Sequence, residues 1–228
     1  MNDLKENLDK VSSRLRRACE AAGRPVATVR LLAVSKRQRA QKVRVVHGLG
    51  QRAFAENVVQ EALAKQSELT DLDIEWHFIG PIQSNKTADI AANFDWAQSV
   101  DREKLLRRLS DQRPQHLPPL NVCLQVNIDD EPHKAGAAAD AAPALADLAA
   151  GLSGIRLRGL MAIPALADDS NGAATASFER MKALFDECRS AGHDLDTLSL
   201  GMSADMERAI MAGSTMVRIG TDIFGPRA

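Results

Sequence analysis

The sequence contains no tyrosine, only 4% aromatic residues and only three cysteines. Cys19, Cys123 and Cys188 lie far apart and form no CxxC pair, so they predict neither a disulfide framework nor a zinc site. We expect reduced structural thiols of a cytoplasmic protein. The five histidines show no HxH or HExxH spacing, and no metal site is predicted.

The charge balance lacks an excess of either sign. The 228 residues include 29 Lys and Arg against 30 Asp and Glu, a formal net charge of −1, which favours no nucleic-acid partner. No apolar run approaches the roughly 18 residues of a membrane span. The charged amino-terminal segment lacks the apolar stretch of a secretory signal. We therefore expect a cytoplasmic protein without nucleic-acid or membrane partners.

Hydrophobic residues follow a helical period in some segments and form short continuous runs in others. Those from Leu4 to Ala18 recur at helical spacing, and this opening helix ends near Gly23. The run VRLLAVS (29–35) is typical of a strand buried on both faces. Further strands are expected at 52–55, 75–79, 95–100, 120–128, 155–163, 197–200 and 216–219. Helices are expected between them at 40–50, 57–65, 84–93, 102–112, 140–151, 173–191 and 204–212.

Eight strands alternating with helices predict an α/β protein, a single (β/α)8 barrel domain over 1–228 with an extra amino-terminal helix. A doubly wound open sheet is the alternative, because periodicity alone does not close a sheet. No GxGxxG follows the first strand, which weakens a dinucleotide-binding version of that alternative. The loops 129–136 and 164–173 follow the fifth and sixth strands, at the end where barrels carry their sites.

Lys36 stands at the end of the first strand, with Leu32 and Val34 beneath it. Partial desolvation at a barrel mouth disfavours the ammonium form and favours the neutral amine, which acts as a nucleophile. The alternative is an ordinary basic loop, because Arg37 and Arg39 follow.

Two loops near the end of the chain have the composition of a phosphate site. Gly201 and Ser203 lead from the seventh strand into a helix, and we expect Ser203 to be its N-cap. Gly220 and Thr221 follow the eighth strand, where glycine permits close backbone approach and threonine adds a hydroxyl. Barrels commonly bind phosphate with these two loops. The alternative for Ser203 is a plain helix cap.

Arg218 lies on the eighth strand, two residues before Gly220. It is either an ion-pair partner of Glu56 or Asp205 or a ligand contact. Because arginine stays protonated and accepts no hydrogen bond, an arginine facing a pyridine nitrogen would keep that nitrogen unprotonated.

Three further polar residues admit two interpretations. His77 fits a structural role better than a functional one, since it stands alone on a strand. Asn57 is either the cap of the next helix or a polar contact at the mouth. Lys134 is expected to be solvated, with a ligand role as the alternative.

Six segments together resemble the pyridoxal-phosphate homeostasis (YggS or PROSC-like) family. They cover nearly the whole chain in order: LLAVSK (31–36), FAENVVQE (54–61), WHFIGPIQSNK (76–86), LNVCLQVNI (120–128), RGLMAIP (158–164) and LSLGMSADMERAIMAGSTMVRIGTDIFG (198–225). The resemblance implies the barrel seen in the amino-terminal domain of alanine racemase.

The resemblance also implies a ligand, pyridoxal 5′-phosphate (PLP), held as a Schiff base on Lys36. Arg218 would face the pyridine nitrogen and Asn57 would lie beside the ring. The phosphate would be held by Met202, Ser203, Gly220 and Thr221. This chain departs from the family pattern at Ala55 and Val58, where glycine and an aromatic residue are usual, which affects the local shape near the cofactor.

The implied function is intracellular PLP homeostasis, in which the protein buffers PLP and hands it to apo forms of PLP-dependent enzymes without catalytic turnover. The alternatives are a single-domain PLP enzyme, such as an amino-acid racemase, and a PLP-independent barrel enzyme acting on a phosphorylated small molecule. Racemisation needs a second base, which in alanine racemase is a tyrosine from a separate β domain. This chain has no tyrosine and no residues for that domain, which also makes the dimer contact, so we expect a non-catalytic monomer.

Overall fold

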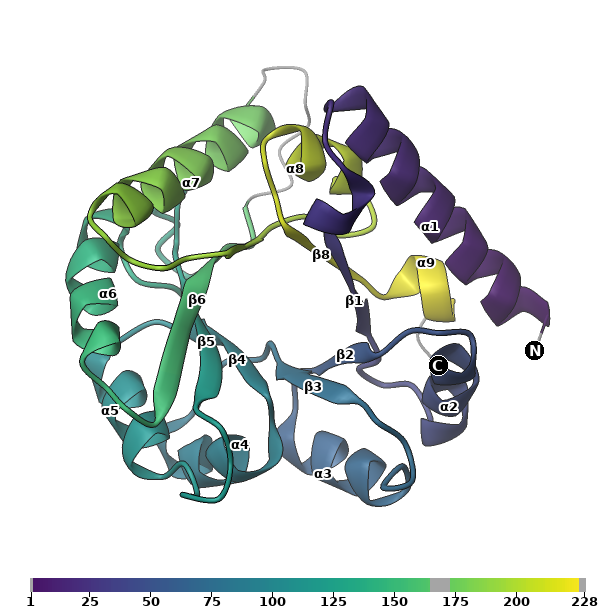
Figure 1. The fold of residues 1–228 in the computed structure, drawn as a ribbon, viewed down its shortest axis with the longest axis horizontal. Coiled ribbons are helices and arrows are strands. Elements are labelled where there is room, and N and C mark those ends of the chain that lie inside the picture. Colours follow the sequence, from purple (N-terminus) through teal and green to yellow (C-terminus); the bar gives the residue numbers. More distant parts are fainter. Residues whose placement is uncertain (1, 165–172, 226–228) are drawn as a thin grey trace.

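The computed structural model describes residues 2–164 and 173–225, and its strands close into one parallel barrel (Figure 1). They follow one another around the barrel in sequence order. Their bounds are β1 Arg30–Val34, β2 Ala53–Glu56, β3 Glu75–Phe78, β4 Trp96–Val100, β5 Leu120–Gln125, β6 Ile155–Met161, β7 Thr197–Ser199 and β8 Met216–Ile219. Pairing of β1 with β8, which sets Leu32 opposite Arg218, closes the sheet. The predicted barrel is therefore confirmed, and the open-sheet alternative is wrong.

Helices form a ring outside the strands (Figure 1). Their bounds are α1 Asn2–Ala21, α2 Ala40–Gly48, α3 Val59–Ser67, α4 Thr87–Asn93, α5 Glu103–Asp111, α6 Ala142–Ala150, α7 Ala173–Ser190, α8 Met206–Met211 and α9 Thr221–Phe224, with 3₁₀ turns at Val26–Thr28, Ser84–Lys86 and Ala139–Ala141. The strand predicted over 120–128 ends at Gln125. Beyond it, the Val126 N–H still donates to the Met161 carbonyl of β6, whereas the Asn127 N–H donates to the Ala137 carbonyl.

The amino-terminal helix α1 occupies the place of an eighth outer helix. The helix that follows β8, α9, has only four residues and is too short to cover the barrel wall. Helix α1 packs against α8, α9 and α2 and so fills the gap between α8 and α2 (Figure 1). Its buried side chains Val11, Leu15 and Cys19 recur at helical spacing. The extra helix predicted from the sequence is therefore part of the closed ring.

The barrel interior holds polar as well as apolar side chains. Trp96, Cys123 and Met216 are buried there, and so are His77 and Gln98. Burial raises the pKa of the Cys123 thiol to about 12, so this cysteine stays a neutral packing group. Among the described residues, no cluster of His, Cys, Asp and Glu could hold a metal ion.

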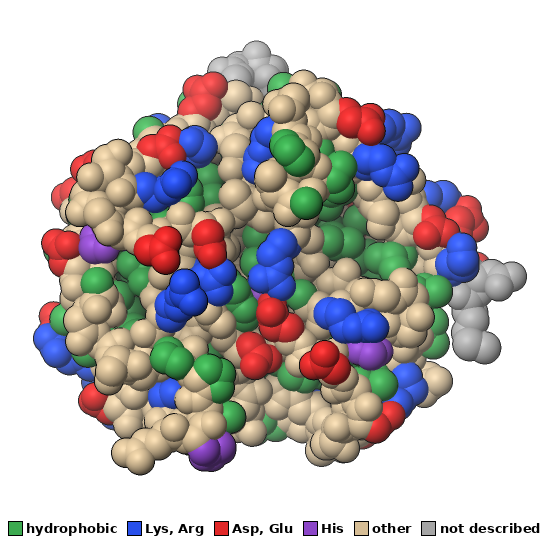
Figure 2. Space-filling view, viewed as in Figure 1, with side chains coloured by type: hydrophobic (Ala, Val, Ile, Leu, Met, Phe, Trp, Pro, Cys, Tyr) green, Lys and Arg blue, Asp and Glu red, His purple; other side chains and the backbone are tan. Residues whose placement is uncertain are grey.

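The outer surface carries charges of both signs. Figure 2 shows acidic and basic side chains interspersed over the face viewed there. None of the helices in the described part of the chain is both long and apolar enough to cross a membrane.

Candidate functional site

A cavity of about 410 Å³ opens at the carboxyl ends of the strands. It is lined by Val34, Lys36, Gln38, Asn57, Ile79, Gly80, Pro81, Met161, Ile163, Met202, Ser203, Ala204, Arg218, Gly220, Thr221 and Gly225. All seven residues predicted for the site are in this lining. They come from the ends of β1, β2, β7 and β8, which the barrel brings together although they are as much as 185 positions apart.

Lys36 lies on a turn whose two neighbours are fixed by hydrogen bonds. Before it, the carbonyl of Ser35 accepts a bond from Lys65 Nζ at 2.8 Å, and the Ser35 hydroxyl donates to Glu56 Oε1 at 2.6 Å. After it, Arg37 adopts a left-handed conformation with φ of 59°, which is unfavourable for a residue with a side chain. The Arg37 N–H donates to Glu61 Oε1 at 2.5 Å, and this bond stabilises the turn.

The groups that fix this turn form a charge cluster of two buried residues, Glu56 and Lys65, and the partly exposed Glu61. Lys65 Nζ lies 2.5 Å from Glu56 Oε1 and 3.4 Å from Glu61 Oε1. The side chains of Glu56 and Lys65 are 0% and 5% exposed, and Glu56 Oε2 has no hydrogen-bond partner among the described residues. Burial raises the pKa of Glu56, although Lys65 and Ser35 favour its charged form. The cluster therefore depends on both partners of the ion pair being present.

The two loops predicted to bind phosphate meet at one side of the cavity. Met202, Ser203 and Ala204 follow β7, and Gly220 and Thr221 follow β8. Among the described residues, the backbone N–H groups of Ser203, Ala204 and Gly220 donate to no protein acceptor. Several such donors at one place favour an anionic group as the missing acceptor.

Ser203 is not the helix cap that the sequence predicted. Helix α8 begins at Met206 and its N-cap is Asp205, because residues 203–205 form a turn first. The Asp205 carboxylate accepts the Met202 N–H at 2.5 Å and so closes that turn. Ser203 is therefore left in the loop, at the cavity, and the plain-cap alternative is also wrong.

Arg218 is buried beneath the cavity and held by the barrel wall. Its Nη1 donates to the carbonyl and hydroxyl of Ser199 at 2.7 and 2.8 Å, and its Nη2 donates to the Ala162 carbonyl at 2.9 Å. Burial lowers the pKa of Arg218 to about 10, so it remains protonated at neutral pH. One Nη2 hydrogen and the Nε hydrogen have no acceptor among the described residues, and they remain available to a ligand.

The ion pairs considered for Arg218 do not form among the described residues. Glu56 pairs with Lys65 instead, and Asp205 accepts the Met202 N–H. The ligand-contact interpretation of Arg218 is therefore the one that the geometry favours.

A chain of hydrogen bonds runs from Arg218 through the barrel interior. Ser199 Oγ donates to Gln98 Oε1 at 2.7 Å, and Gln98 Nε2 lies 2.8 Å from His77 Nδ1. His77 Nε2 lies 2.6 Å from Glu75 Oε1. Burial lowers the pKa of His77, so the ring is neutral, with Nδ1 as acceptor and Nε2–H as donor. His77 thus has the structural role expected for it, because its contacts support the residues that orient Arg218.

Asn57 lines the cavity and caps no helix, since the N-cap of α3 is Val58. Gly80, after β3, packs directly against it. A Cβ on Gly80 would lie 2.1 Å from the Asn57 carbonyl oxygen, which no real contact allows. Glycine at position 80 therefore lets the ends of β2 and β3 approach closely enough to shape this wall.

Replacing Gly80 by alanine is expected to displace Asn57 and to destabilise the protein by about 1–3 kcal/mol, the usual cost of overpacking. Urea unfolding measures this change. Gly48→Ala is the matched control, because a Cβ there meets nothing within 4 Å. Equal stability of the two variants would contradict this role of Gly80.

The apolar part of the cavity lining was not predicted. Ile79, Pro81, Met161 and Ile163 supply an apolar surface, and Gln38 lies near the turn of Lys36. In the sequence, only their positions could have indicated these four apolar residues, because they end or follow the third and sixth strands. Residues 165–172 of the predicted loop after the sixth strand lie outside the described residues.

Lys134 lies at the rim and not in the described lining. It pairs with Glu131 at 2.5 Å and donates to the Ile163 carbonyl at 3.3 Å. The loop 129–136 therefore touches a residue of the cavity wall without entering the cavity itself.

The chain is similar to known proteins over almost its whole length. A family model described as alanine racemase, N-terminal domain, matches residues 7–228. The pyridoxal phosphate homeostasis protein of Pseudomonas aeruginosa is 54% identical, covering 100% of this chain and 97% of the relative. Its counterpart from Escherichia coli K12 is 46% identical, covering 100% and 98%.

Two solved structures are similar over nearly the whole chain. They are PipY of Synechococcus elongatus without PLP and with PLP bound. Both are 36% identical and cover 97% of this chain and 100% of their own, with TM-scores of 0.87 and 0.85.

Proposed function

This chain belongs to the pyridoxal phosphate homeostasis proteins, and on that premise we propose that it binds PLP in the described cavity. One observation carries the proposal. A lysine amine, a buried arginine with unused donors and two loops of unused N–H groups meet around one cavity. These groups match an aldehyde, a pyridine nitrogen and a phosphate in turn.

Each part of PLP has a candidate partner in this chain. Lys36 would hold the aldehyde as a Schiff base, while Ser203, Thr221 and the N–H groups near Met202 and Gly220 would hold the phosphate. Arg218 would donate to the pyridine nitrogen and keep it unprotonated, and Asn57 would contact the ring from β2. The relatives named for PLP homeostasis and the PLP-bound PipY structure support this ligand.

We propose further that the protein buffers and delivers PLP and does not turn over a substrate. Bound PLP can act as an electron sink for a carbanion, but a neutral pyridine nitrogen weakens that sink. In the described lining, the ionisable side chains are those of Lys36 and Arg218. A racemase needs a second base on the far side of its substrate. The surroundings of Lys36 therefore suit holding an aldehyde better than reacting with it.

Transfer to an apo-enzyme tests the delivery role. The PLP-loaded protein is mixed with an aminotransferase stripped of its cofactor, in the presence of a scavenger that removes free PLP. We expect the recovery of aminotransferase activity to exceed that obtained with an equal amount of free PLP. Recovery no faster than the spontaneous release of PLP from this protein would overturn the delivery role while leaving PLP binding intact.

Formation of the opposite enantiomer from a single amino acid, dependent on Lys36, would instead support a racemase. This assay uses the same loaded protein with each amino acid in turn.

A further inference from the structure

Arg14 connects the amino-terminal helix to both of the loops proposed to hold phosphate. Its Nε and Nη2 donate to the two carboxylate oxygens of Glu207 at 2.8 and 3.0 Å, and Nη2 also donates to the Ser203 carbonyl at 3.0 Å. Its Nη1 donates to Asp222 Oδ2 at 2.5 Å. Ser203 belongs to the loop after β7, and Asp222 adjoins Thr221 in α9, the short helix that directly follows Gly220 after β8.

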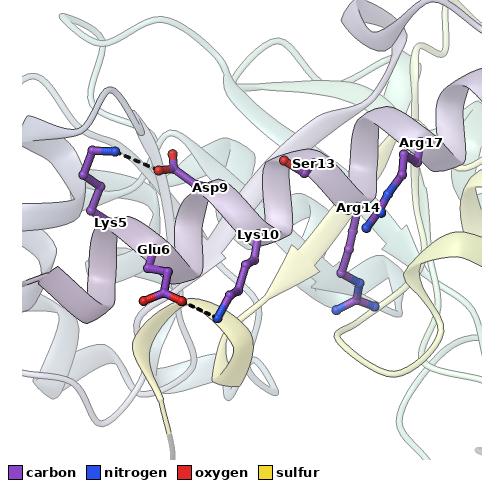
Figure 3. Close-up of a pocket in the computed structure, with 7 residues that line it drawn as sticks. All are labelled: Lys5, Glu6, Asp9, Lys10, Ser13, Arg14 and Arg17. Atoms are coloured by element: carbon purple, nitrogen blue, oxygen red, sulfur yellow. Dashed lines mark hydrogen bonds and ion pairs between the residues drawn. The ribbon is translucent and has the colours of Figure 1, made fainter.

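These contacts set Arg14 apart from the other charged residues of α1. Lys5 pairs with Asp9 and Lys10 pairs with Glu6, in each case four residues along the same helix (Figure 3). Such exposed pairs contribute little to stability. Arg14 extends from the next turn of α1, and its partners are 189 to 208 positions away in the sequence (Figure 3). The Arg14 side chain is 29% exposed, which is less than half the exposed fraction of each side chain in these pairs.

One of these bonds joins Arg14 to the backbone of a residue that lines the cavity. The Ser203 carbonyl, which accepts from Arg14, belongs to a residue that lines the cavity and whose own N–H donates to no acceptor among the described residues. A bidentate arginine–carboxylate pair has a fixed geometry, so Arg14 fixes the positions of Glu207 and Ser203 relative to Asp222. The gap between the two loops therefore depends on α1, an element outside the eight strand–helix units.

We infer that Arg14 is a positioning residue that holds the loops after β7 and β8 at the separation a phosphate group requires. The inference rests on the proposed function for its ligand. The preference of the cavity for a phosphorylated aldehyde then depends on a residue that does not line the cavity.

Comparing PLP with pyridoxal, the same aldehyde without phosphate, tests this inference. Both ligands are titrated into the wild-type protein, Arg14→Met and Arg14→Lys, and binding is followed by visible absorbance. We expect Arg14→Met to weaken PLP binding about tenfold, the effect of losing roughly one charge-assisted hydrogen bond. Pyridoxal binding should change less than about twofold, and Arg14→Lys should be intermediate, because lysine keeps the charge but not the bidentate geometry.

Lys10→Met is the matched control on the same helix, since Lys10 pairs with Glu6 within α1. It should leave both affinities unchanged. If Arg14→Met folds poorly, Glu207→Gln tests the same arrangement with a smaller expected loss of PLP affinity. An equal loss of PLP and pyridoxal affinity, or no loss, would overturn the inference.

Amide hydrogen exchange of the ligand-free protein gives a readout that needs no PLP. We expect faster exchange at the hydrogen-bonded amides of Met202, Asp205 and Ile223 in Arg14→Met than in Lys10→Met, and equal exchange would contradict a positioning role. If the wild-type protein binds neither aldehyde, the proposed function fails. If it prefers PLP and Arg14→Met keeps the full preference, only the role of Arg14 fails.

Discussion

Replacing Lys36 by alanine is expected to abolish the visible absorption band of the PLP-loaded protein without unfolding the barrel. Lys36 supplies the amine that the proposed Schiff base requires, whereas the turn around it is fixed by Ser35, Glu61 and Lys65. The phosphate loops remain, so PLP should still bind, roughly a hundredfold more weakly, which corresponds to about 3 kcal/mol. Absorbance titration and equilibrium dialysis measure the two effects.

Lys134→Ala is the matched control for this prediction. Lys134 also lies at the mouth of the barrel, where it contacts Glu131 and the Ile163 carbonyl. The band should persist in this variant. A band that survives in Lys36→Ala and disappears in Lys134→Ala would show that Lys134, and not Lys36, binds the aldehyde.

Replacing Lys65 by methionine is expected to cost about 3–5 kcal/mol of the free energy of unfolding, because Glu56 would be left buried without its partner. The loss removes the hydrogen bond to the Ser35 carbonyl as well. The turn that presents Lys36 would then lose one of the three hydrogen bonds that fix it, so the affinity for PLP should also fall. Denaturant unfolding and absorbance titration are measured on the same preparation.

A second substitution separates the buried charge from lost packing. In the double variant Glu56→Leu with Lys65→Met, no charge of the buried ion pair remains. Replacing both partners of a buried ion pair by apolar residues is often neutral or stabilising relative to breaking it. The double variant should therefore be more stable than Lys65→Met alone. If it is less stable, lost packing and not the unpaired carboxylate explains the cost.

The sequence predicted the barrel well because its strands are distinct in pattern. The run 29–35 and the alternating helices indicate buried parallel strands, and the bounds of β8 are those expected. The site was predicted for a different reason, namely that loops at the same end of a barrel converge. Lys36, Ser203 and Thr221 reach one cavity on that principle alone.

Other features could not be predicted from the sequence because they depend on register and side-chain direction. The contact between Arg14 and Ser203 joins residues 189 positions apart, and no local pattern marks it. The N-cap of α8 was misassigned to Ser203 because both serine and aspartate favour that position. The Asp205 carboxylate bonds to the Met202 N–H, and that bond places the start of the helix. The link from Gln98 to His77 and Ser199 likewise follows only from the closed barrel.

Reductive trapping identifies the lysine that binds PLP. The PLP-loaded wild-type protein is treated with borohydride, digested and analysed by mass spectrometry to locate the attached pyridoxyl phosphate. We expect one modified position, Lys36, in near-stoichiometric yield. Modification mainly at another lysine, or none in a protein saturated with PLP, would contradict a Schiff base on Lys36.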